Sequence, residues 1–228
     1  DVDITDGLEA SARRARYAAL DACAEKNGAT LVFLGHTRDD QSESVLLGLA
    51  RGSGARSLSA MAMRNGKYVR PLLAITREET LGTCAEAQLD PWDDPHNADK
   101  TFTRVRVRHD VIPNLEKNLG PGISAALART ASLLRDDADA LDQLAEQEFA
   151  AHDALSLDIS RLEKLPKAIR TRVLRMAVYA AGAPAGSLSA DHIAPIEALI
   201  TEWSGQGPSD LPGGVRVSRI SGRLSLSR

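Results

Sequence analysis

The chain has 228 residues, of which 43% are hydrophobic and 26% charged, and its formal net charge is −3. This composition predicts one large or two small folded domains and argues against an intrinsically disordered chain. No apolar stretch reaches the roughly 18–20 residues that a transmembrane helix needs, and the acidic first ten residues predict no signal peptide, so we expect no membrane partner. Cys23 and Cys84 stand far apart, which argues against a zinc ribbon or a disulfide scaffold and favours a cytoplasmic location.

Charge is segregated along the chain. Residues 136–153 hold seven acids and no Lys or Arg, whereas residues 161–175 hold six bases and a single acid. Residues 211–228 add four arginines and no acid. The net charge gives no nucleic-acid signal, but this distribution predicts that the C-terminal third carries the basic part of the protein.

The start of the chain predicts a helix, a strand and a second helix. Asp6 and Glu9 have the spacing of a capping box, and the helix that they open ends at Asn27–Gly28. The apolar run ATLVFL, residues 29–34, is bounded by glycines and predicts a fully buried strand of a parallel sheet. A second helix is expected over residues 40–51. This alternation predicts an α/β doubly wound sheet.

The second helix is expected to place Val45, Leu46 and Leu49 on one face. A Gly/Ser loop, RGSGARS, follows it and leads into a short helical turn. The backbone amides of such a loop can cradle an anion, but a loop of this composition is more often only a connection.

Further local signals divide the middle of the chain. An Asn65–Gly66 turn precedes a short strand that Pro71 stops. Thr76 and Glu79 form a second capping box, which predicts a helix that reaches about Leu89.

The rest of the chain is expected to be mainly helical. A helix over 103–117 carries several cations near its start, and GPG at 120–122 marks a hinge before a long helix over 123–152. The remaining predicted elements are a strand at 155–160, a helix capped by Ser160 and Glu163 and continuing to 182, a helix from Ser189 to Trp203, a loop at 205–214 and a hairpin around Ser221–Gly222.

The stretch GHTRDDQSES, residues 35–44, has the strongest chemical content. In an open α/β sheet, ligands bind beyond the carboxyl ends of the strands, where this stretch is expected to lie. Asp39, Asp40 and Glu43 fit two roles, because acids also favour the first turn of a helix. Asp40 and Glu43 are three residues apart, so they share a helix face and can converge on one cation, an ammonium group or a metal.

Three arginines are candidates for phosphate binding, for which the guanidinium fork is well shaped. Arg104, Arg106 and Arg108 stand at alternate positions in RVRVRH, so they would line one face of a strand or fan out from a helix. A solvated basic surface is the alternative. Arg13 and Arg16 are neighbours on the first helix and could equally be surface residues paired with Glu9.

Five segments of the chain, in their order over residues 8–116, resemble the tRNA(Ile)-lysidine synthetase family: EASARRARY, GHTRDDQSESVLLGLARGSGARSLSAM, RPLLAITREE, PWDDPHNADKTFTRVRVRH and VIPNLE. The tail, with LDISRLEKLPKAIRTRVLR and LPGGVRV, is similar to that family's second domain. The resemblance implies an α/β fold, a partial doubly wound parallel sheet of the adenine nucleotide alpha hydrolase-like, PP-loop ATPase type. A smaller, mainly helical domain with a C-terminal β-hairpin would follow.

The resemblance also implies a division of the chain and a reaction. Residues 1–119 would be the ATP pyrophosphatase domain, 120–153 a long linker helix and 154–228 a helical tRNA-binding domain with the hairpin. With ATP and Mg²⁺, the family adenylates C2 of the wobble cytidine of tRNA(Ile) with the CAU anticodon, and free L-lysine displaces AMP. Decoding then changes from AUG to AUA.

Residue roles carry over from the resemblance position by position. Asp40 and Glu43 would hold the ammonium group of lysine, which leaves Asp39 as a plain helix cap. Cofactor-binding roles near ATP fall to Arg13, Arg16 and His36. Phosphate or the target nucleotide would be contacted by Arg104, Arg106 and Arg108. No residue is implied as a metal ligand.

The chain departs from the family in lacking the SGGxDS loop that holds ATP and the first βα unit that carries it. We therefore expect it to begin in mid-domain and to be inactive alone. Two alternatives stay open: another PP-loop tRNA modification, such as thiolation, and a non-catalytic tRNA-binding fragment. Cys23 and Cys84 lack the CxxC pattern typical of thiolation. A homodimer is also compatible with the sequence.

Overall fold

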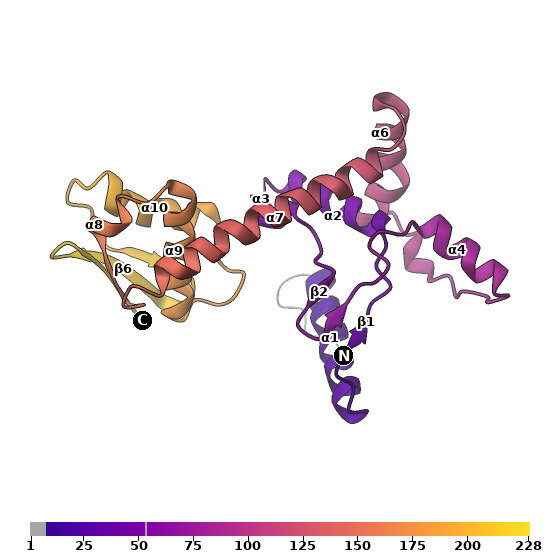
Figure 1. The fold of residues 1–228 in the computed structure, drawn as a ribbon, viewed down its shortest axis with the longest axis horizontal. Helices are drawn as coiled ribbons and strands as arrows, with labels where there is room; N and C mark the ends of the chain where they lie inside the picture. The colour runs from indigo at the N-terminus through magenta and orange to yellow at the C-terminus, as the bar shows by residue number, and fades with distance from the viewer. Residues whose placement is uncertain (1–7, 53) are drawn as a thin grey trace. The chain divides into compact units, whose positions relative to one another are not determined.

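The computed structural model describes residues 8–52 and 54–228 (Figure 1). The predicted cap at Asp6 lies outside these residues. The chain forms two compact units, Asp1–Arg135 and Asp136–Arg228, called here the first and the second unit. The boundary falls inside the long helix α7 (Ile123–Phe149), which corresponds to the helix expected over 123–152.

The first unit contains helices and a small sheet. Its elements up to the boundary helix are α1 (Leu8–Lys26), β1 (Val32–Phe33), α2 (Arg38–Ala50), α3 (Ala55–Leu58), β2 (Arg64–Asn65), β3 (Tyr68–Val69), α4 (Arg77–Glu86), a 3₁₀ turn (Pro95–Asn97), α5 (Thr103–Arg106), a π-helical turn (Val107–Val111) and α6 (Ile112–Leu119).

The sheet has the order β1-β3-β2, with β1 parallel to β3 and β2 antiparallel to it. The parallel pairing predicted for the ATLVFL run is therefore confirmed. The prediction that this run is fully buried is wrong, because Phe33 is 67% exposed and Leu31 is 37% exposed. The strand is only two residues long, and no described element packs over the Phe33 side chain.

Helix α2 buries a polar face, not the predicted apolar one. Val45 is buried, but Leu49 is 61% exposed, whereas Gln41, Ser42 and Glu43 are buried. The Gln41 amide donates to the Met61 carbonyl and accepts from the Met61 amide, both at 2.8 Å. These bonds satisfy the polar groups that the helix withdraws from water, which makes their burial possible.

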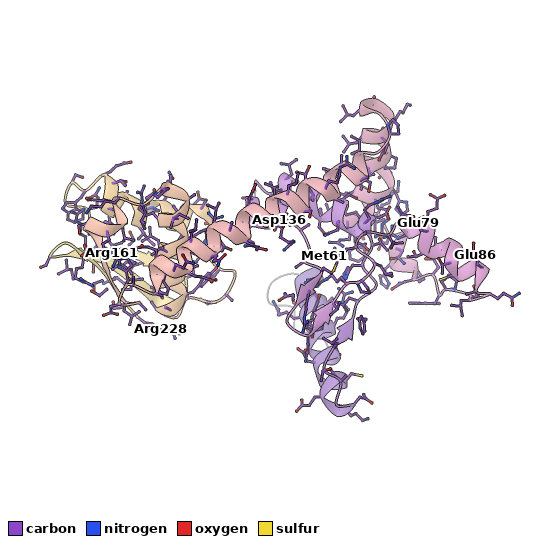
Figure 2. All side chains as sticks on the ribbon, viewed as in Figure 1. Met61, Glu79, Glu86, Asp136, Arg161 and Arg228 are labelled. Carbon is purple, nitrogen blue, oxygen red and sulfur yellow. The ribbon has the colours of Figure 1, made fainter. Side chains whose placement is uncertain are left out.

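The local signals of the middle region are confirmed. Thr76 and Glu79 form the predicted capping box of α4. The helix ends at Glu86, three residues before the predicted end at about Leu89. Figure 2 labels the side chains of Glu79 and Glu86. Helix α5, the π turn and α6 make residues 103–119 helical, so the arginines of RVRVRH fan out as on a helix.

Helix α1 is joined to the small sheet through its aromatic residues. The Tyr68 hydroxyl donates to the Asp21 carboxylate, and Lys67 approaches the same carboxylate at 2.6 Å. The rings of Tyr17 and Tyr68 meet edge to face with 4.8 Å between centroids. These contacts fix the helix that carries Arg13 and Arg16.

The second unit packs helices on an antiparallel sheet of order β4-β7-β6-β5. Its remaining elements are β4 (Ser156–Asp158), α8 (Ile159–Leu162), α9 (Lys167–Ala180), α10 (Ala190–Thr201), β5 (Ser209–Leu211), a 3₁₀ turn (Pro212–Gly214), β6 (Val215–Ile220) and β7 (Arg223–Ser227). The predicted hairpin is β6–β7, and its two strands form the centre of this sheet.

Two local predictions in the second unit are wrong. Asp158 caps α8 through the Ser160 amide, and Pro166 precedes α9, so Ser160 and Glu163 do not cap a helix. The stretch expected as a loop contains β5, which pairs with β6. That pairing depends on a neighbouring strand, so the Gly- and Pro-rich sequence gave no sign of it.

No helix among the described residues is long and apolar enough to cross a membrane.

Candidate active site

Two acids of α2 meet three arginines from other elements, and we call this group the acid–arginine cluster. Its members are Asp40, Glu43, Arg77, Arg104 and Arg108. Arg77 begins α4, Arg104 lies in α5, and Arg108 lies in the π turn that follows α5. Two segments distant in sequence from α2, the start of α4 and residues 104–108, therefore converge on one face of that helix.

Asp40 has both of its carboxylate oxygens occupied. Oδ2 accepts from the amide and the hydroxyl of Thr37, the residue before α2, at 2.8 and 3.0 Å. Oδ1 lies 3.2 Å from Arg77 Nη2 and 3.4 Å from Arg108 Nη2. The side chain is 13% exposed, so Asp40 can still be reached by a ligand.

Asp39 was expected to be the plain cap of α2, and this expectation is wrong. The residue at the N-cap of α2 is Thr37, and Asp40 supports it. Asp39 instead accepts from the Arg77 amide at 2.8 Å, and the Arg38 amide donates to the Ile75 carbonyl. Asp39 therefore joins the start of α2 to the start of α4.

Glu43 is an internal counter-ion with a side chain that is 0% exposed. Arg108 donates to it twice, from Nε at 2.7 Å and from Nη2 at 3.2 Å, and Arg77 and Arg104 each stand 3.9 Å away. Burial by itself would lower the pKa of Arg108, but the bonds to Glu43 and the charge of Asp40 raise it above its usual value. Arg108 is therefore always charged in this cluster.

The three arginines of RVRVRH divide into two sets. Arg104 and Arg108 are four residues apart and face α2, where Arg104 also donates to the Ser44 hydroxyl at 3.4 Å. Arg106 turns the other way and donates to the carbonyls of Lys100 and Thr101 at 2.7 and 2.8 Å. The π turn lies between Arg106 and the following helix and is the kind of irregularity that is frequent at functional sites.

A pocket of about 680 Å³ opens beside the cluster. Its charged lining consists of four arginines and two aspartates: Arg13, Arg16, Arg104, Arg108, Asp40 and Asp94. These six side chains give the pocket wall a surplus of two positive charges. The wall is therefore suited to an anion such as a phosphate group.

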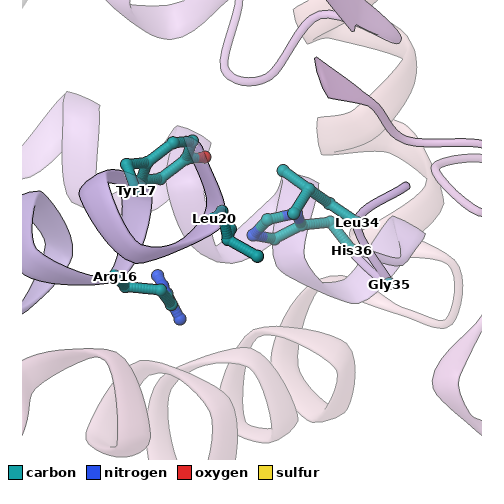
Figure 3. Close-up of a pocket in the computed structure, with 6 residues that line it drawn as sticks. All are labelled: Arg16, Tyr17, Leu20, Leu34, Gly35 and His36. Carbon is teal, nitrogen blue, oxygen red and sulfur yellow. The ribbon is translucent and has the colours of Figure 1, made fainter. Parts of the chain in front are cut away.

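A smaller cavity of about 280 Å³ lies between α1 and the end of β1 (Figure 3). Arg16, Tyr17 and Leu20 line it from the helix, and Leu34, Gly35 and His36 line it from the segment after the strand. Arg16 and His36 also line the larger pocket, so the two spaces adjoin. Its lining combines two leucines and a tyrosine with the polar side chains of Arg16 and His36.

His36 is neutral at pH 7. Burial lowers its pKa below the usual value of about 6.5, Asp40 raises it, and the charges of Arg70, Arg104 and Arg16 lower it further. Its Nδ1 atom is buried and has no hydrogen-bond partner among the described residues. A neutral imidazole with an unused nitrogen can donate to or accept from a bound ligand.

Comparisons with known proteins identify the two halves of this architecture. Residues 1–115 match the family described as a PP-loop domain, and residues 157–225 match the TilS substrate binding domain. The chain is 53% identical to the tRNA(Ile)-lysidine synthase of Thermobifida fusca, over 99% of this chain and 70% of the relative. The chain belongs to the tRNA(Ile)-lysidine synthase family.

Other members of the lysidine synthase family are similarly close. The synthase of Streptomyces coelicolor is 56% identical over 96% of this chain and 64% of its own length. That of Mycolicibacterium paratuberculosis is 48% identical over the whole chain and 71% of its own length. The chain thus spans about two thirds of these synthases, and the PP-loop match implies the use of ATP.

Most residues that the sequence marked as a lysidine synthase site come together at the larger pocket. Its lining includes Arg13, Arg16, His36, Asp40, Arg104 and Arg108. Glu43 lies behind Arg108, fully buried, and Arg106 is directed to main-chain carbonyls. Both acids meet a cation, as their spacing predicted, but the cations are arginines of this chain.

Sequence reasoning missed Arg77 as a member of the site. It is 37 residues away from Asp40 along the chain, and nothing in the local pattern of TREE distinguishes it from a solvated helix residue. The one available signal was that Arg77 directly follows the capping residue Thr76, which places Arg77 in the first turn of α4.

Proposed function

We propose that the full-length protein ligates lysine to C2 of the wobble cytidine of tRNA(Ile), using ATP to adenylate the cytidine first. The observation that carries this proposal is the pocket in which Arg16, Arg104 and Arg108 stand beside the acids of α2. Family membership supports the reaction, because the relatives are named for it.

The first step transfers AMP to the base. The C2 oxygen of cytidine attacks the α-phosphorus of ATP, and the bond from that phosphorus to pyrophosphate breaks. Negative charge grows on the phosphoryl oxygens, and fixed guanidinium groups stabilise it because they need no reorganisation at the moment of reaction. We assign this role to Arg104 and Arg108, which bonds to Ser44 and Glu43 hold at one wall of the pocket.

The second step forms the carbon–nitrogen bond. An amine of lysine attacks C2, the bond from C2 to its oxygen breaks, AMP leaves with that oxygen, and the amine loses a proton. The attacking amine must be neutral, while the other amine of lysine stays charged. We assign the charged amine to Asp40, since it lines the pocket, and we assign Glu43 the task of holding Arg108.

We propose no Mg²⁺ ligand among the residues that the structure describes. Among the described residues, no group of three or more His, Cys, Asp or Glu side chains could hold a metal ion. The two acids of α2 are bonded to arginines and do not fit a magnesium site. We therefore propose only that Mg²⁺ accompanies the phosphates of ATP.

We propose that the second unit binds tRNA(Ile) with the CAU anticodon. Arg219 and Arg223 of its central strands bond to main-chain carbonyls or a hydroxyl, not to acids, in the described contacts. Such cations contact phosphates without reading sequence, so tRNA affinity should fall steeply with salt.

The reaction's substrates occur together in the cytoplasm, which we propose as the location. Sedimentation of the full-length protein tests the predicted homodimer.

The test uses the full-length protein with tRNA(Ile), ATP and lysine. We expect AMP formation that requires both tRNA and lysine, and lysidine in the recovered tRNA. Asp40→Asn keeps the size of the side chain and should raise the KM for lysine about tenfold or more, because a bond to a charged group is lost. Asp90→Asn, at an exposed acid, is the matched control. ATP consumption that requires a sulfur donor and not lysine would establish thiolation instead.

A further inference from the structure

Arg77 is a charged residue of the cluster to which the proposed steps give no task. Its main chain is fixed, because its amide donates to Asp39 at 2.8 Å. Its guanidinium lies 3.2 Å from Asp40 Oδ1 and 3.9 Å from Glu43 Oε1. The described lining of the larger pocket includes Arg104 and Arg108 but not Arg77. Arg77 therefore reaches the acids from outside the pocket wall.

The carboxylates of the cluster are already surrounded by cations. Two carboxylates face three guanidinium groups within 4 Å, and the nearby Asp39 carboxylate adds a third negative charge beside Arg77 and Arg108. A further cation that approaches Asp40 is repelled by the guanidinium groups unless one of them gives up its contact. Thr37 holds Oδ2 of Asp40, so the exchange must occur at Oδ1, which Arg77 and Arg108 share.

The contacts indicate which arginine yields. Arg108 is 19% exposed and makes two bonds to Glu43, the shorter at 2.7 Å. Arg77 is 32% exposed and makes one bond, of 3.2 Å, to the acids. At Asp40 Oδ1 itself, Arg77 stands slightly closer than Arg108, at 3.2 against 3.4 Å, but Arg108 is fixed in place by its paired bonds to Glu43. Arg77 is therefore the partner that can leave Asp40 without breaking a hydrogen bond to Glu43.

We propose that Arg77 is a positioning residue that sets the affinity for lysine. It neutralises Asp40 in the free protein, and the ammonium group of lysine competes with it for Oδ1. This inference rests on the proposed function. It involves an exchange of ion pairs and no covalent change. Arg77 thereby keeps the site favourable to anions until the amine substrate arrives.

The experiment replaces Arg77 in the full-length protein and compares the KM values of two substrates. Arg77→Gln removes the competing charge, so the KM for lysine should fall about threefold, while the KM for ATP stays unchanged or rises. Arg77→Lys retains the charge and should restore the wild-type KM for lysine. Arg64→Gln is the control, since Arg64 bonds to the Gly66 carbonyl and should alter neither value.

A KM for lysine that rises or stays the same in Arg77→Gln would overturn the inference. If Asp40→Asn still raises that KM, the proposed function survives and only the role of Arg77 fails. If Asp40→Asn has no effect either, the lysine site itself is wrong. Arg77→Met is a second uncharged variant, and circular dichroism of both variants shows whether they fold. If neither uncharged variant folds, Arg77 is a structural residue and the inference is overturned.

Discussion

The interiors of the two units differ in chemistry. In the second unit, apolar side chains from α7, α9, α10 and the sheet form one core, with Val173, Ile196 and Leu224 fully buried. In the first unit, fully or nearly buried side chains include Ser42 and Glu43 of α2. Apolar burial is non-directional and stabilises a fold, whereas a buried polar network fixes the direction of each group.

Two buried glutamates show what this difference means. Glu197 of α10 is bonded to Arg170 at 2.8 Å and approached by Lys167 at 3.3 Å, and because the Lys167 side chain is 77% exposed, this group lies at the edge of the unit's interior. Glu43 meets three arginines, two of which line an open pocket. The same pairing of acid and arginine is therefore a packing feature in one unit and part of a candidate site in the other.

The largest expected effect tests the apolar core. Leu224→Ala in β7 should lower the free energy of unfolding by about 2–5 kcal/mol, because it leaves a cavity in the fully packed second unit. Leu49→Ala, at a leucine of α2 that is 61% exposed, should change it by about 0.5 kcal/mol or less. Urea unfolding followed by circular dichroism measures both, and equal losses would contradict the contrast between the units.

The next effect tests the cationic wall of the first unit. Arg108→Gln should lower kcat/KM for lysine-dependent AMP formation about 100-fold, because it removes the proposed donor to the phosphoryl group and the two short bonds that Glu43 accepts from Arg108. Arg106→Gln should lower it about threefold at most, since Arg106 bonds to main-chain carbonyls. If the Arg106 variant loses as much activity, the division of these arginines is wrong.

The smallest effect concerns Glu197 and pH. Burial would raise the pKa of Glu197, but the bonds from Arg170 and Lys167 outweigh it and hold the pKa below 4.5. The unfolded chain then binds the proton more readily, so the ionised pair stabilises the fold above about pH 4.5. This stability is lost as pH falls through the folded-state pKa.

Glu197→Gln provides the comparison for that pH dependence. At pH 7 the variant should be less stable than the wild type by about 1–2 kcal/mol, because Arg170 keeps only a neutral partner. The difference should shrink as pH is lowered below about 4.5. Urea unfolding at several pH values measures it, and a constant difference would show that the charge of Glu197 does not contribute.

Features with a local cause could be read from the sequence. The capping box of Thr76 and Glu79, the helical region 103–117 and the final hairpin each depend on residues close together in the chain. Asp40, Glu43, Arg104 and Arg108 of the candidate site were also identifiable, because the ordered family segments mark their positions, whereas Arg77 was missed. The buried face of α2 was not, since its glutamine and serine are buried only where Met61 and Ser124 satisfy them.

By itself, the sequence determined the family, the order of most elements and the identity of the charged residues. Only the tertiary structure decided which charges meet. Arg108 lies 65 residues from Glu43 and Arg77 lies 37 residues from Asp40, so no periodicity or spacing could pair them. The physical reason is that an ion pair depends on distance in space and on exclusion of water, and both are set when α2, α4 and α5 pack together.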